Sequence, residues 1–310
     1  MRSDPISSKS RLDPTVSALK LLVLGANGQL GSDFTYYADQ LGYETVGLTH
    51  EDVEVTNRDQ LFDVLGRMGF DAIINTTAYQ GPKAYRDSSP AASYDVNAHA
   101  PYHLAEFAAE NHKVLVHIST DFVFSGCTPP EAHAFTEQDL PQPANLYAAS
   151  KLAGESLIPL ATESYFVFRL ASLYGATGSR AKDHSNFVKT VVGKLSNNEP
   201  VRIVDDIRSS PTSAKSVVFK IAEVIATEKY GLYHLAGSGS CTWYEFAVEI
   251  ASQLKLPVDL IERSSTREVA QEVKRGNNTS LRNQRLVDEG FEDLAPWQEN
   301  LREYLRERRM

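Results

Sequence analysis

Tyr147 and Lys151 stand four residues apart in the segment NLYAASK, the spacing of neighbours on one face of a helix. A free tyrosine has a pKa of about 10, so it neither donates nor accepts a proton readily at neutral pH. A cation held within about 4–6 Å favours the phenolate and lowers that pKa, which suits the phenol to general acid or base catalysis. Because such a pair also occurs by chance, a simple neighbour contact stays open until other residues support the chemistry.

Three glycines follow the first apolar run of the chain, in the segment GANGQLG. Glycines at a strand-to-helix turn allow a tight bend and a close approach to a pyrophosphate, while the helix start offers free N–H groups and partial positive charge. The spacing is G-x-x-G-x-x-G, and a plain glycine turn is the alternative. The predicted dinucleotide-binding residues of this loop are Gly25, Asn27, Gly28, Gln29, Leu30 and Gly31.

Composition favours a globular protein with an ample core, since 42% of the 310 residues are hydrophobic and 23% are charged. The net charge of −9 would repel nucleic acid overall. Cys127 and Cys241 form neither a disulfide framework nor a metal-binding spacing, so no metal site is predicted. The apolar runs are too short to span a membrane. Residues 1–18 are interpreted as a flexible extension without the apolar core of a secretory signal, and we expect a cytoplasmic location.

Strand-like and helix-like segments alternate from residue 19 to about residue 172. The predicted strands are the segments LKLLVLGA, YETVGL, DAIINTTA, KVLVHIST and YFVFRLAS. Their consecutive apolar residues fit strands that are buried on both faces. The alternation predicts the α/β class, with a Rossmann-like doubly wound parallel sheet.

Two helices of this region have recognisable sequence signals. Thr56 and Asp59 resemble a capping box that opens a helix over about 57–68. A longer helix is predicted over about 89–111, because apolar residues recur at every fourth position: Val96, Ala100, Leu104 and Ala108.

Three charged or titratable residues lie near predicted strands without an obvious chemical partner. His112 and His117 flank an apolar run and are interpreted as ordinary strand residues. Arg169 ends another apolar run and is interpreted as structural.

After Tyr174 the alternation loosens, and we infer a smaller mixed C-terminal substrate-binding domain. It contains a helix in NFVKTVVGKL and a strand in PVRIVDD, whereas the capped helix in SPTSAKSVVFKIAEVIA and the strand in GLYHLAGS return to the sheet. The predicted domains are therefore a dinucleotide-binding domain over 19–172, joined by about 212–238, and a substrate-binding domain over 173–211 and 239–310.

The glycine loop, STDFVFSG and NLYAASKLAGE occur in this order, followed by NFVKT, VDDIRSSPTSA, YHLAGSGSCTWYEFA and RGNNTSL. On these segments, which extend over nearly the whole chain after Lys20, the sequence resembles the extended short-chain dehydrogenase/reductases and, more closely, the dTDP-4-dehydrorhamnose reductase family. The resemblance implies an oxidoreductase that uses NADPH or NADH to reduce the C4 keto group of a nucleotide-linked 4-keto-6-deoxy sugar. The implied partner is a small-molecule sugar nucleotide, with neither nucleic acid nor a membrane, and a homodimer is left open.

The resemblance also implies roles for individual residues. Tyr147 would protonate the C4 oxygen, Lys151 would bind the nicotinamide ribose and lower the Tyr147 pKa, and Thr120 would hydrogen-bond the same oxygen. Further cofactor-binding residues would be Thr77, Ala78, Tyr79 and Asn97, and substrate-binding residues would be Asp121, Phe122, Ser172, Asn186, Arg208, Arg275 and Asn278.

The residue types agree with these roles but leave alternatives. Thr77 and Thr120 end predicted parallel strands, where open sheets bind ligands, and arginine suits bidentate phosphate contacts. Three alternatives stay open: Thr120 as a turn cap, Asn97 as an ordinary polar helix residue, and the arginines Arg208 and Arg275 as solvated surface charges.

The choice between NADH and NADPH rests on the end of the second predicted strand, GLTHED. An acidic residue there favours the ribose 2′-OH and an arginine favours a 2′-phosphate. Thr49 and His50 are neither, and Glu51 lies further along. Asp52 and Val53 are predicted to line the adenine, so the cofactor choice stays open.

Two departures from the family pattern touch the predicted sugar end of the site. Ser172, in the segment RLASLYG, takes the place of a tryptophan that borders the sugar in the family. The loop QGPKAYRD, residues 80–87, is one residue longer than its family counterpart. A related 4-reductase acting on a different deoxysugar is therefore an alternative. A non-catalytic regulatory subunit of the same fold, like the methionine adenosyltransferase β-subunit, is a further one.

Overall fold

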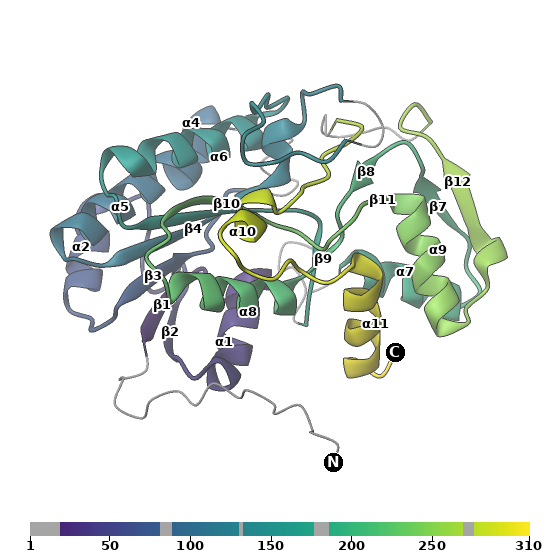
Figure 1. Cartoon of the computed structure of the whole chain (residues 1–310), viewed down its shortest axis with the longest axis horizontal. Helices are drawn as coiled ribbons and strands as arrows, with labels where there is room; N and C mark the ends of the chain where they lie inside the picture. The colour runs from purple at the N-terminus through teal and green to yellow at the C-terminus, as the bar shows by residue number, and fades with distance from the viewer. Residues whose placement is uncertain (1–18, 81–88, 130–132, 177–185, 269–275) are drawn as a thin grey trace, which may run out of the picture.

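The computed structural model describes residues 19–80, 89–129, 133–176, 186–268 and 276–310, and its larger part is built on one parallel sheet (Figure 1). The strand order is β10–β5–β4–β3–β1–β2, with every neighbouring pair parallel. The strands are β1 (Lys20–Leu24), β2 (Glu44–Leu48), β3 (Ala72–Asn75), β4 (Val114–Thr120), β5 (Tyr165–Leu170) and β10 (Gly231–Leu235). The predicted α/β fold with a Rossmann-like sheet is confirmed.

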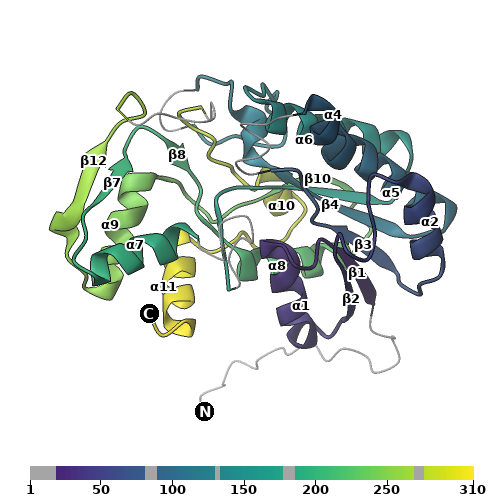
Figure 2. The same ribbon diagram turned by 180° about the vertical axis from the view of Figure 1, so that it is seen from behind.

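Successive side chains of each strand point to opposite faces of the sheet, and each face has its own hydrophobic core. Leu21 and Val23 pack with the helices α1 (Gln29–Leu41) and α8 (Ala214–Ile225). Leu22 and Leu24 pack on the opposite side with α2 (Arg58–Gly66) and α5 (Ala100–Glu110). Figures 1 and 2 show these pairs of helices on opposite faces of the sheet, as a doubly wound fold requires.

The predicted helix at 89–111 forms as three consecutive segments, in which a π-helical turn lies between two α-helical stretches. It consists of α4 (Pro90–Tyr94), a π-helical turn η1 (Asp95–His99) and α5. Of the four residues in the predicted apolar spacing, Ala100, Leu104 and Ala108 are buried, whereas Val96, in the π turn, is half-buried. The π turn was not predicted, and it places Asn97 inside the protein.

Two expectations of the sequence were wrong in detail. The helix α2 is capped by Asn57, whose side chain accepts a hydrogen bond from Gln60 N at 3.1 Å, and not by Thr56. The Thr56 hydroxyl instead donates to Glu54 Oε1 at 2.8 Å. His112 lies in the turn between α5 and β4 with φ of 53°, because the chain reverses there to enter the strand.

The smaller part of the structure is a mixed α/β region with its own core. Phe246 and Trp297 are buried at its centre. Its elements are β6 (Leu173–Tyr174), α7 (Phe187–Ser196), β7 (Val201–Val204), β8 (Arg208–Ser209), β9 (Thr212–Ser213), β11 (Cys241–Thr242), α9 (Trp243–Leu254), η5 (Val258–Leu260), β12 (Ile261–Ser264) and α11 (Trp297–Glu307). The predicted helix in NFVKTVVGKL and strand in PVRIVDD are therefore present.

The chain returns to the sheet more than once after residue 173. The predicted capped helix and core strand are α8, which begins after the cap Ser213, and β10. The short helix α10 (Gln284–Asp288) also lies against β10 and buries Leu286 in the core on the α1 side (Figure 1). The proposed domain boundaries stay a prediction, because part of the 239–310 segment packs on the sheet.

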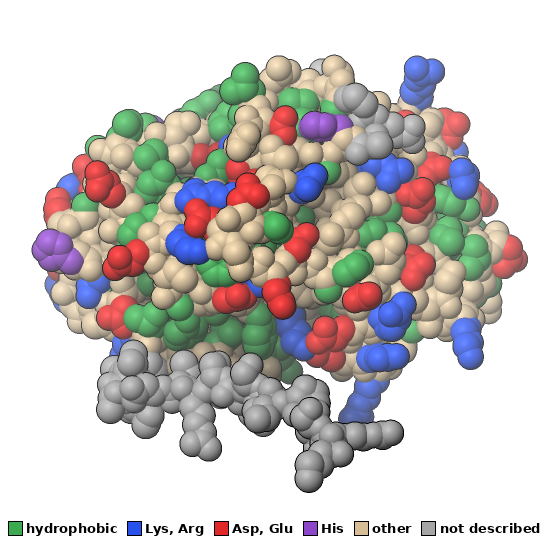
Figure 3. Space-filling view, viewed as in Figure 1, with side chains coloured by type: hydrophobic (Ala, Val, Ile, Leu, Met, Phe, Trp, Pro, Cys, Tyr) green, Lys and Arg blue, Asp and Glu red, His purple; other side chains and the backbone are tan. Residues whose placement is uncertain are grey.

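The surface carries both signs of charge. On the described part of the face in Figure 3, basic side chains lie beside acidic ones over most of the elements. On the described part of this face, such mixing gives no broad positive field of the kind that attracts a polyanion. Within the described residues, no helix has the length and apolar character needed to cross a bilayer.

Candidate active site

The order of strands reverses at β1, which pairs with β2 on one side and β3 on the other. In open α/β sheets, ligands bind outside the carboxyl ends of the strands at such a reversal. The glycine loop follows β1, and Thr76 follows β3 and donates its hydroxyl to Leu24 O at 2.7 Å. The predicted phosphate loop therefore lies at the position where this fold binds dinucleotides.

The glycine loop is too tight for side chains at two of its positions. Gly25 has φ of 78°, and a Cβ there would lie 2.8 Å from Thr76 Oγ1. A Cβ on Gly31 would lie 2.3 Å from Gly25 O. Gly28 is less restricted, since its nearest atom, again Gly25 O, would be 3.1 Å away. The following helix α1 begins at Gln29, with Leu30 buried and Asn27 half-buried in the loop. These features form a backbone cradle that fits a pyrophosphate.

The segment after β2 forms a turn closed by its own side chains. Asp52 Oδ2 accepts hydrogen bonds from Thr49 N at 2.7 Å and from Thr49 Oγ1 at 2.9 Å. The backbone and hydroxyl of Thr49 lower the Asp52 pKa, so this carboxylate is ionised and already engaged. Val53 is buried beside it, whereas His50 and Glu51 are exposed. The turn leaves His50 as an exposed imidazole where the ribose is predicted.

Thr120 is the last residue of β4, at the same edge of the sheet. Its hydroxyl oxygen accepts a hydrogen bond from Phe122 N at 3.2 Å, capping the short helix η2 (Asp121–Phe124), and it donates to Asp121 Oδ1 at 3.2 Å. The turn-capping alternative for Thr120 is thus present in the structure, and a contact of its hydroxyl with the substrate stays a prediction. Asp121 is buried, and its Oδ2 accepts a hydrogen bond from Thr279 Oγ1 at 2.6 Å. Burial raises the Asp121 pKa to about 6.

The predicted pair lies on the helix α6 (Leu146–Leu157), which begins after the cap Asn145. Tyr147 and Lys151 are both buried, at 7% and 1% exposure, one turn apart on the helix. The Tyr147 ring meets the ring of Phe122 edge-on at 6.2 Å between centroids. The helix α6 therefore brings the phenol to the end of β4, where Thr120 and Phe122 lie.

A close approach between α6 and the π turn holds Asn97 in place. A Cβ on Gly154 would lie 2.2 Å from Asn97 O, so only glycine permits this packing. Asn97 Oδ1 accepts from Tyr79 N at 2.8 Å, and its Nδ2 donates to Tyr79 O at 3.1 Å and to Ser150 Oγ at 2.9 Å. Asn97 thus fixes the backbone after β3, where half-buried Thr77, Ala78 and Tyr79 are predicted to meet the cofactor.

Lys151 reaches beneath β4 rather than into open solvent. Its Nζ donates to Ile118 O and lies 3.1 Å from His117 Nε2. Burial lowers the Lys151 pKa to about 7, against the opposing effect of the Glu155 carboxylate. Burial, and then the Lys151 charge, hold the His117 pKa well below its usual value. His117, interpreted as an ordinary strand residue, is therefore a direct neighbour of the predicted site.

Arg169 is structural, as interpreted. It forms a buried ion pair with Glu155, with Nη2 to Oε2 at 2.7 Å and both side chains less than a tenth exposed. Ser119 Oγ also donates to this carboxylate. The pair anchors the far end of α6 to β4 and β5.

The residues predicted to hold the sugar nucleotide lie where the sheet meets the smaller region. Asn186 is buried and caps α7, while its Nδ2 donates to Gly175 O and Tyr304 Oη at 3.3 Å each. Arg208 donates to Ser240 O at 3.3 Å and pairs with Glu245 at 3.5 Å. Asn278 pairs with Arg208 through the backbone and donates to His133 O at 2.8 Å. Their nucleotide contacts stay predictions, and Arg275 lies outside the described residues.

Ser172 is half-buried with φ of 36°, and its hydroxyl lies 2.7 Å from the hydroxyl of Ser209. The second family departure, the loop at 80–87, lies outside the described residues except for Gln80. Among the residues that the structure describes, no three His, Cys, Asp or Glu side chains are grouped to hold a metal ion.

The glycine cradle, Thr120 and the Tyr147–Lys151 turn thus occupy one edge of the sheet, and comparison with known proteins decides the family. The family model described as "RmlD substrate binding domain" matches residues 19–310. The chain belongs to this family.

Curated members of the RmlD family are similar over almost their whole length. The spore coat polysaccharide biosynthesis protein SpsK of Bacillus subtilis is 30% identical over 289 residues, covering 93% of this chain and 98% of SpsK. The dTDP-4-dehydrorhamnose reductase of Aggregatibacter actinomycetemcomitans is 30% identical over 274 residues, covering 84% and 90%.

Solved structures agree with this RmlD-family assignment. The dTDP-4-dehydrorhamnose reductase of Bacillus anthracis in complex with NADP has a TM-score of 0.85 at 30% identity, covering 94% of this chain and 99% of that one. The UDP-glucose 4-epimerase of Thermus thermophilus with NAD, at 18% identity and a TM-score of 0.76, shares the fold. The predicted family and the predicted class, a nicotinamide-dependent oxidoreductase, are confirmed.

Proposed function

We propose that this protein reduces the C4 keto group of a nucleotide-linked 4-keto-6-deoxy sugar, with dTDP-4-dehydro-L-rhamnose as the first candidate substrate and dTDP-L-rhamnose as the product. The observation that carries the proposal is the position of Tyr147 and Lys151 on α6, at the strand end where Thr120 and the glycine cradle also lie. Relatives named dTDP-4-dehydrorhamnose reductase, similar over most of their length, support this choice of sugar nucleotide.

The residues present fit a nicotinamide dinucleotide, because Gly25 and Gly31 permit a tight turn between β1 and α1 in which a side chain would clash, so the backbone and the start of α1 can approach a pyrophosphate closely. When bound, this cofactor supplies a hydride to C4. Tyr147 donates its phenolic proton to the oxygen, so that the carbonyl becomes a secondary alcohol, and the phenolate regains a proton from solvent. Thr120 donates a hydrogen bond to the same oxygen, and Lys151 as an ammonium holds the ribose and stabilises the Tyr147 phenolate.

The cofactor choice follows from the turn at Thr49. We infer that NADH and NADPH both serve, within about tenfold in affinity, or about 1.4 kcal/mol, because Asp52 is engaged in its own turn and the exposed His50 is neither a carboxylate nor a guanidinium. His50→Arg should shift the balance toward NADPH through contact with the 2′-phosphate. Fluorescence titrations of both cofactors measure the ratio, and a native preference beyond about a hundredfold would mean that another residue reads the ribose.

The activity itself is tested by incubating the full chain with NADPH and a panel of dTDP-, UDP- and GDP-linked 4-keto-6-deoxy sugars. The loss of NADPH absorbance gives the rate, and NMR of the product gives the configuration at C4. The proposal expects the dTDP substrate to react fastest, with L-rhamnose as the product sugar. No NADPH oxidation with any member of the panel would favour the regulatory subunit.

A different deoxysugar is a second candidate, and Ser172 favours it. Its small side chain, hydrogen-bonded to Ser209, stands where the family pattern has a large aromatic ring. A wider or differently substituted sugar ring would be accommodated there. Faster turnover of another member of the panel than of dTDP-4-dehydro-L-rhamnose would establish this reading.

A further inference from the structure

Two buried polar residues meet between the central strands β3 and β4. Asn75 and His117 are register partners on these parallel strands, and both are fully buried. Asn75 Nδ2 lies 3.1 Å from His117 Nδ1. Polar groups this deep require partners, so the direction of each hydrogen bond can be worked out.

The orientation of the Asn75 amide is set by Thr77. Asn75 Oδ1 accepts hydrogen bonds from Thr77 N at 3.1 Å and from Thr77 Oγ1 at 2.6 Å. A backbone N–H can only donate, so the atom that faces it is the amide oxygen. The amide NH2 group then faces His117 and donates to Nδ1. His117 Nδ1 therefore carries no proton.

The state of His117 follows from this contact. Burial, the larger cause, keeps the His117 pKa well below its usual value even without a charge on Lys151, so the ring is neutral and its proton is on Nε2. That N–H points at Lys151 Nζ, 3.1 Å away, and Nζ itself donates to Ile118 O. An ammonium has three donors and no acceptor, whereas a neutral amine offers one lone pair. Only the neutral amine satisfies both contacts.

The charges around Lys151 come from several elements. On its own helix, Glu155 favours the ammonium, but Arg169 of β5 neutralises that carboxylate. Tyr147 is the other titratable residue one turn away on α6. On the packed elements, β4 contributes His117 and η2 contributes Asp121, while Asp95 and His99 of the π turn pair with each other at the surface.

We propose that His117 is a positioning residue for Lys151: Asn75 locks its imidazole in the Nε2–H tautomer, and this N–H, with Ile118 O, holds the Lys151 amine neutral until it contacts the cofactor ribose. The use of Lys151 by the cofactor rests on the proposed function. Lys151 then gains a proton as it moves to the ribose hydroxyls. Cofactor affinity should fall by about tenfold per pH unit above the Lys151 pKa of about 7, since each binding event takes up one proton.

The tautomer is measured directly by 15N NMR of the full chain with labelled histidines, and His117→Gln assigns the signal. The proposal expects a protonated Nε2, an unprotonated Nδ1 and no titration between about pH 6 and 9. A protonated Nδ1, or an imidazolium in this range, would overturn it. This measurement needs neither substrate nor turnover, so its failure leaves the proposed reductase activity standing, and absent activity leaves the tautomer standing.

A substitution at Asn75 tests the link to Lys151. Asn75→Asp replaces the donating NH2 by an accepting oxygen, which draws the His117 proton to Nδ1 and turns Nε2 into an acceptor for the ammonium. The pH at which NADPH affinity begins to fall should rise by about one unit, a tenfold gain in affinity above it. Asn57→Asp, at the exposed cap of α2, is the matched control and should leave this pH unchanged.

A merely structural role would lower the melting temperature of Asn75→Asp without moving the pH profile of NADPH binding. An unmoved profile in a folded Asn75→Asp protein would therefore overturn the proposal. If Asn75→Asp does not fold, His117→Phe keeps the ring volume and removes both nitrogens. It removes the N–H that faces the amine but leaves Lys151 buried, so the decline of NADPH affinity, which begins near pH 7 in the wild type, should begin at a higher pH. A decline that begins at the wild-type pH in His117→Phe would also overturn the proposal.

Discussion

Tyr147 and Thr120 approach the proposed substrate oxygen from different elements, one from the first turn of a helix and the other from the end of a strand. Neither residue is activated alone. In the proposed mechanism the phenol depends on Lys151, which is an ammonium once it contacts the cofactor ribose, and the threonine hydroxyl is held by Phe122 N and Asp121. Because each side chain is nearly buried, small displacements of these neighbours should be felt in the rate.

Asp121 makes stability depend on pH in a definite direction. Burial raises its pKa from 3.8 to about 6, so the native state holds this proton more tightly than the unfolded chain does. The stabilisation is full below about pH 4 and is lost as the pH rises through about 6. Asp121→Asn keeps the shape and removes the titration. The difference in unfolding free energy between Asp121→Asn and wild type should therefore shift in favour of the variant by on the order of 2–3 kcal/mol as the pH rises from about 4 to 7.

Urea unfolding at the two pH values measures this difference. Asp59→Asn, an exposed carboxylate on α2, is the control and should change little with pH relative to wild type. An Asp121→Asn protein whose stability follows the wild type across the same range would show that the Asp121 pKa is not raised in the native state.

The sequence could predict the reacting residues but not their partners. Tyr147, Lys151 and Thr120 stand in motifs that have a fixed spacing, so they could be named from the chain alone. Asn75, His117 and Ser150 lie inside apolar runs or beside better-known residues, and their contacts join β3, β4, α6 and the π turn. Such contacts depend on strand register and helix approach, which local patterns do not encode. The one sequence feature that pointed to these contacts was a histidine, His117, inside an otherwise apolar strand.

At the scale of elements, the glycine loop and α6 are positioned by close backbone approaches. Gly31 packs against Gly25, and Gly154 packs against Asn97. The helices were predictable from capping and apolar spacing. The π turn was not, because Ala100, Leu104 and Ala108 all follow it in α5, and their regular spacing carries no sign of the irregular turn before them. That turn nevertheless aims Asn97 at the Tyr79 backbone.

Gly31→Ala should damage the phosphate cradle while the fold survives. The added Cβ would lie 2.3 Å from Gly25 O, so the loop must shift away from the position that receives a pyrophosphate. NADPH should bind at least about tenfold more weakly, a loss of about 1.4 kcal/mol. Gly66→Ala is the control, since nothing lies within 4 Å of its Cβ. Fluorescence titration and circular dichroism check both variants, and unchanged NADPH affinity in Gly31→Ala would defeat the phosphate-loop assignment.

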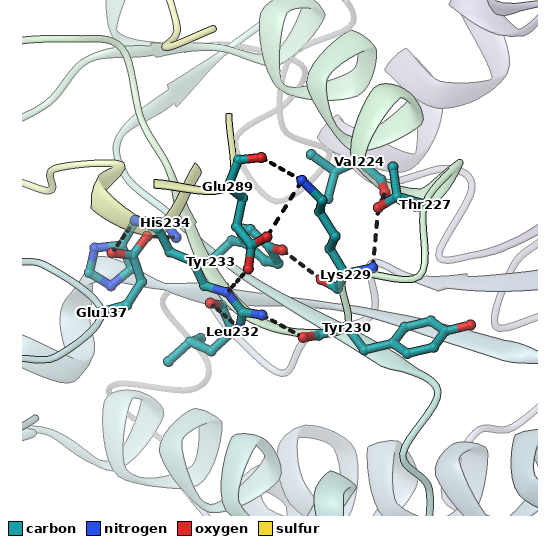
Figure 4. A network of polar contacts seen from close by, with 10 residues as sticks. Glu137, Val224, Thr227, Lys229, Tyr230, Leu232, Tyr233, His234 and Glu289 are labelled. Atoms are coloured by element: carbon teal, nitrogen blue, oxygen red, sulfur yellow. Dashed lines mark hydrogen bonds and ion pairs between the residues drawn. The ribbon is translucent and has the colours of Figure 1, made fainter. Parts of the chain in front are cut away.

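At the scale of the whole molecule, β10 is an outer strand of the sheet, and its free backbone edge is covered by side chains (Figure 4). Arg285 donates to Tyr230 O at 2.6 Å and to Leu232 O at 3.3 Å, while Glu137 accepts from His234 N at 2.8 Å. Three backbone groups at alternate positions along this edge, Tyr230 O, Leu232 O and His234 N, therefore have side-chain partners. Edge strands with unpaired backbone groups can pair with strands of other chains, so these side-chain contacts should hinder association through β10.

Arg285→Met should uncover two of these carbonyl groups. The loss of two charge-assisted but partly exposed hydrogen bonds should cost about 1–2 kcal/mol of unfolding free energy and promote association through the strand edge. Urea unfolding and light scattering measure the two effects. Arg202→Met, which removes an exposed ion pair with Glu268, should cost less than about 1 kcal/mol and cause no association. Equal losses in the two variants would contradict the edge-covering role.

The overall architecture follows from the sequence more closely than its internal boundaries do. The strands are continuous apolar runs separated by helical patterns, which leaves a parallel sheet as the consistent arrangement. The packing of α10 against β10 could not be predicted from the sequence pattern. It depends on Leu286, Arg285 and Glu137, which are far apart in the chain or unremarkable in their local sequence.

The central claim is that Tyr147 supplies the proton for reduction of a keto sugar. The turnover of Tyr147→Phe with NADPH and dTDP-4-dehydro-L-rhamnose tests it most directly, because this change removes one oxygen and leaves the glycine loop untouched. Turnover should fall by about 10²–10⁴, the usual contribution of general acid–base catalysis, while NADPH affinity stays within about twofold. Tyr165→Phe, at the opposite end of β5, is the matched control and should react as wild type does. Wild-type turnover in Tyr147→Phe would reduce the Tyr147–Lys151 pair to a neighbour contact and contradict the account.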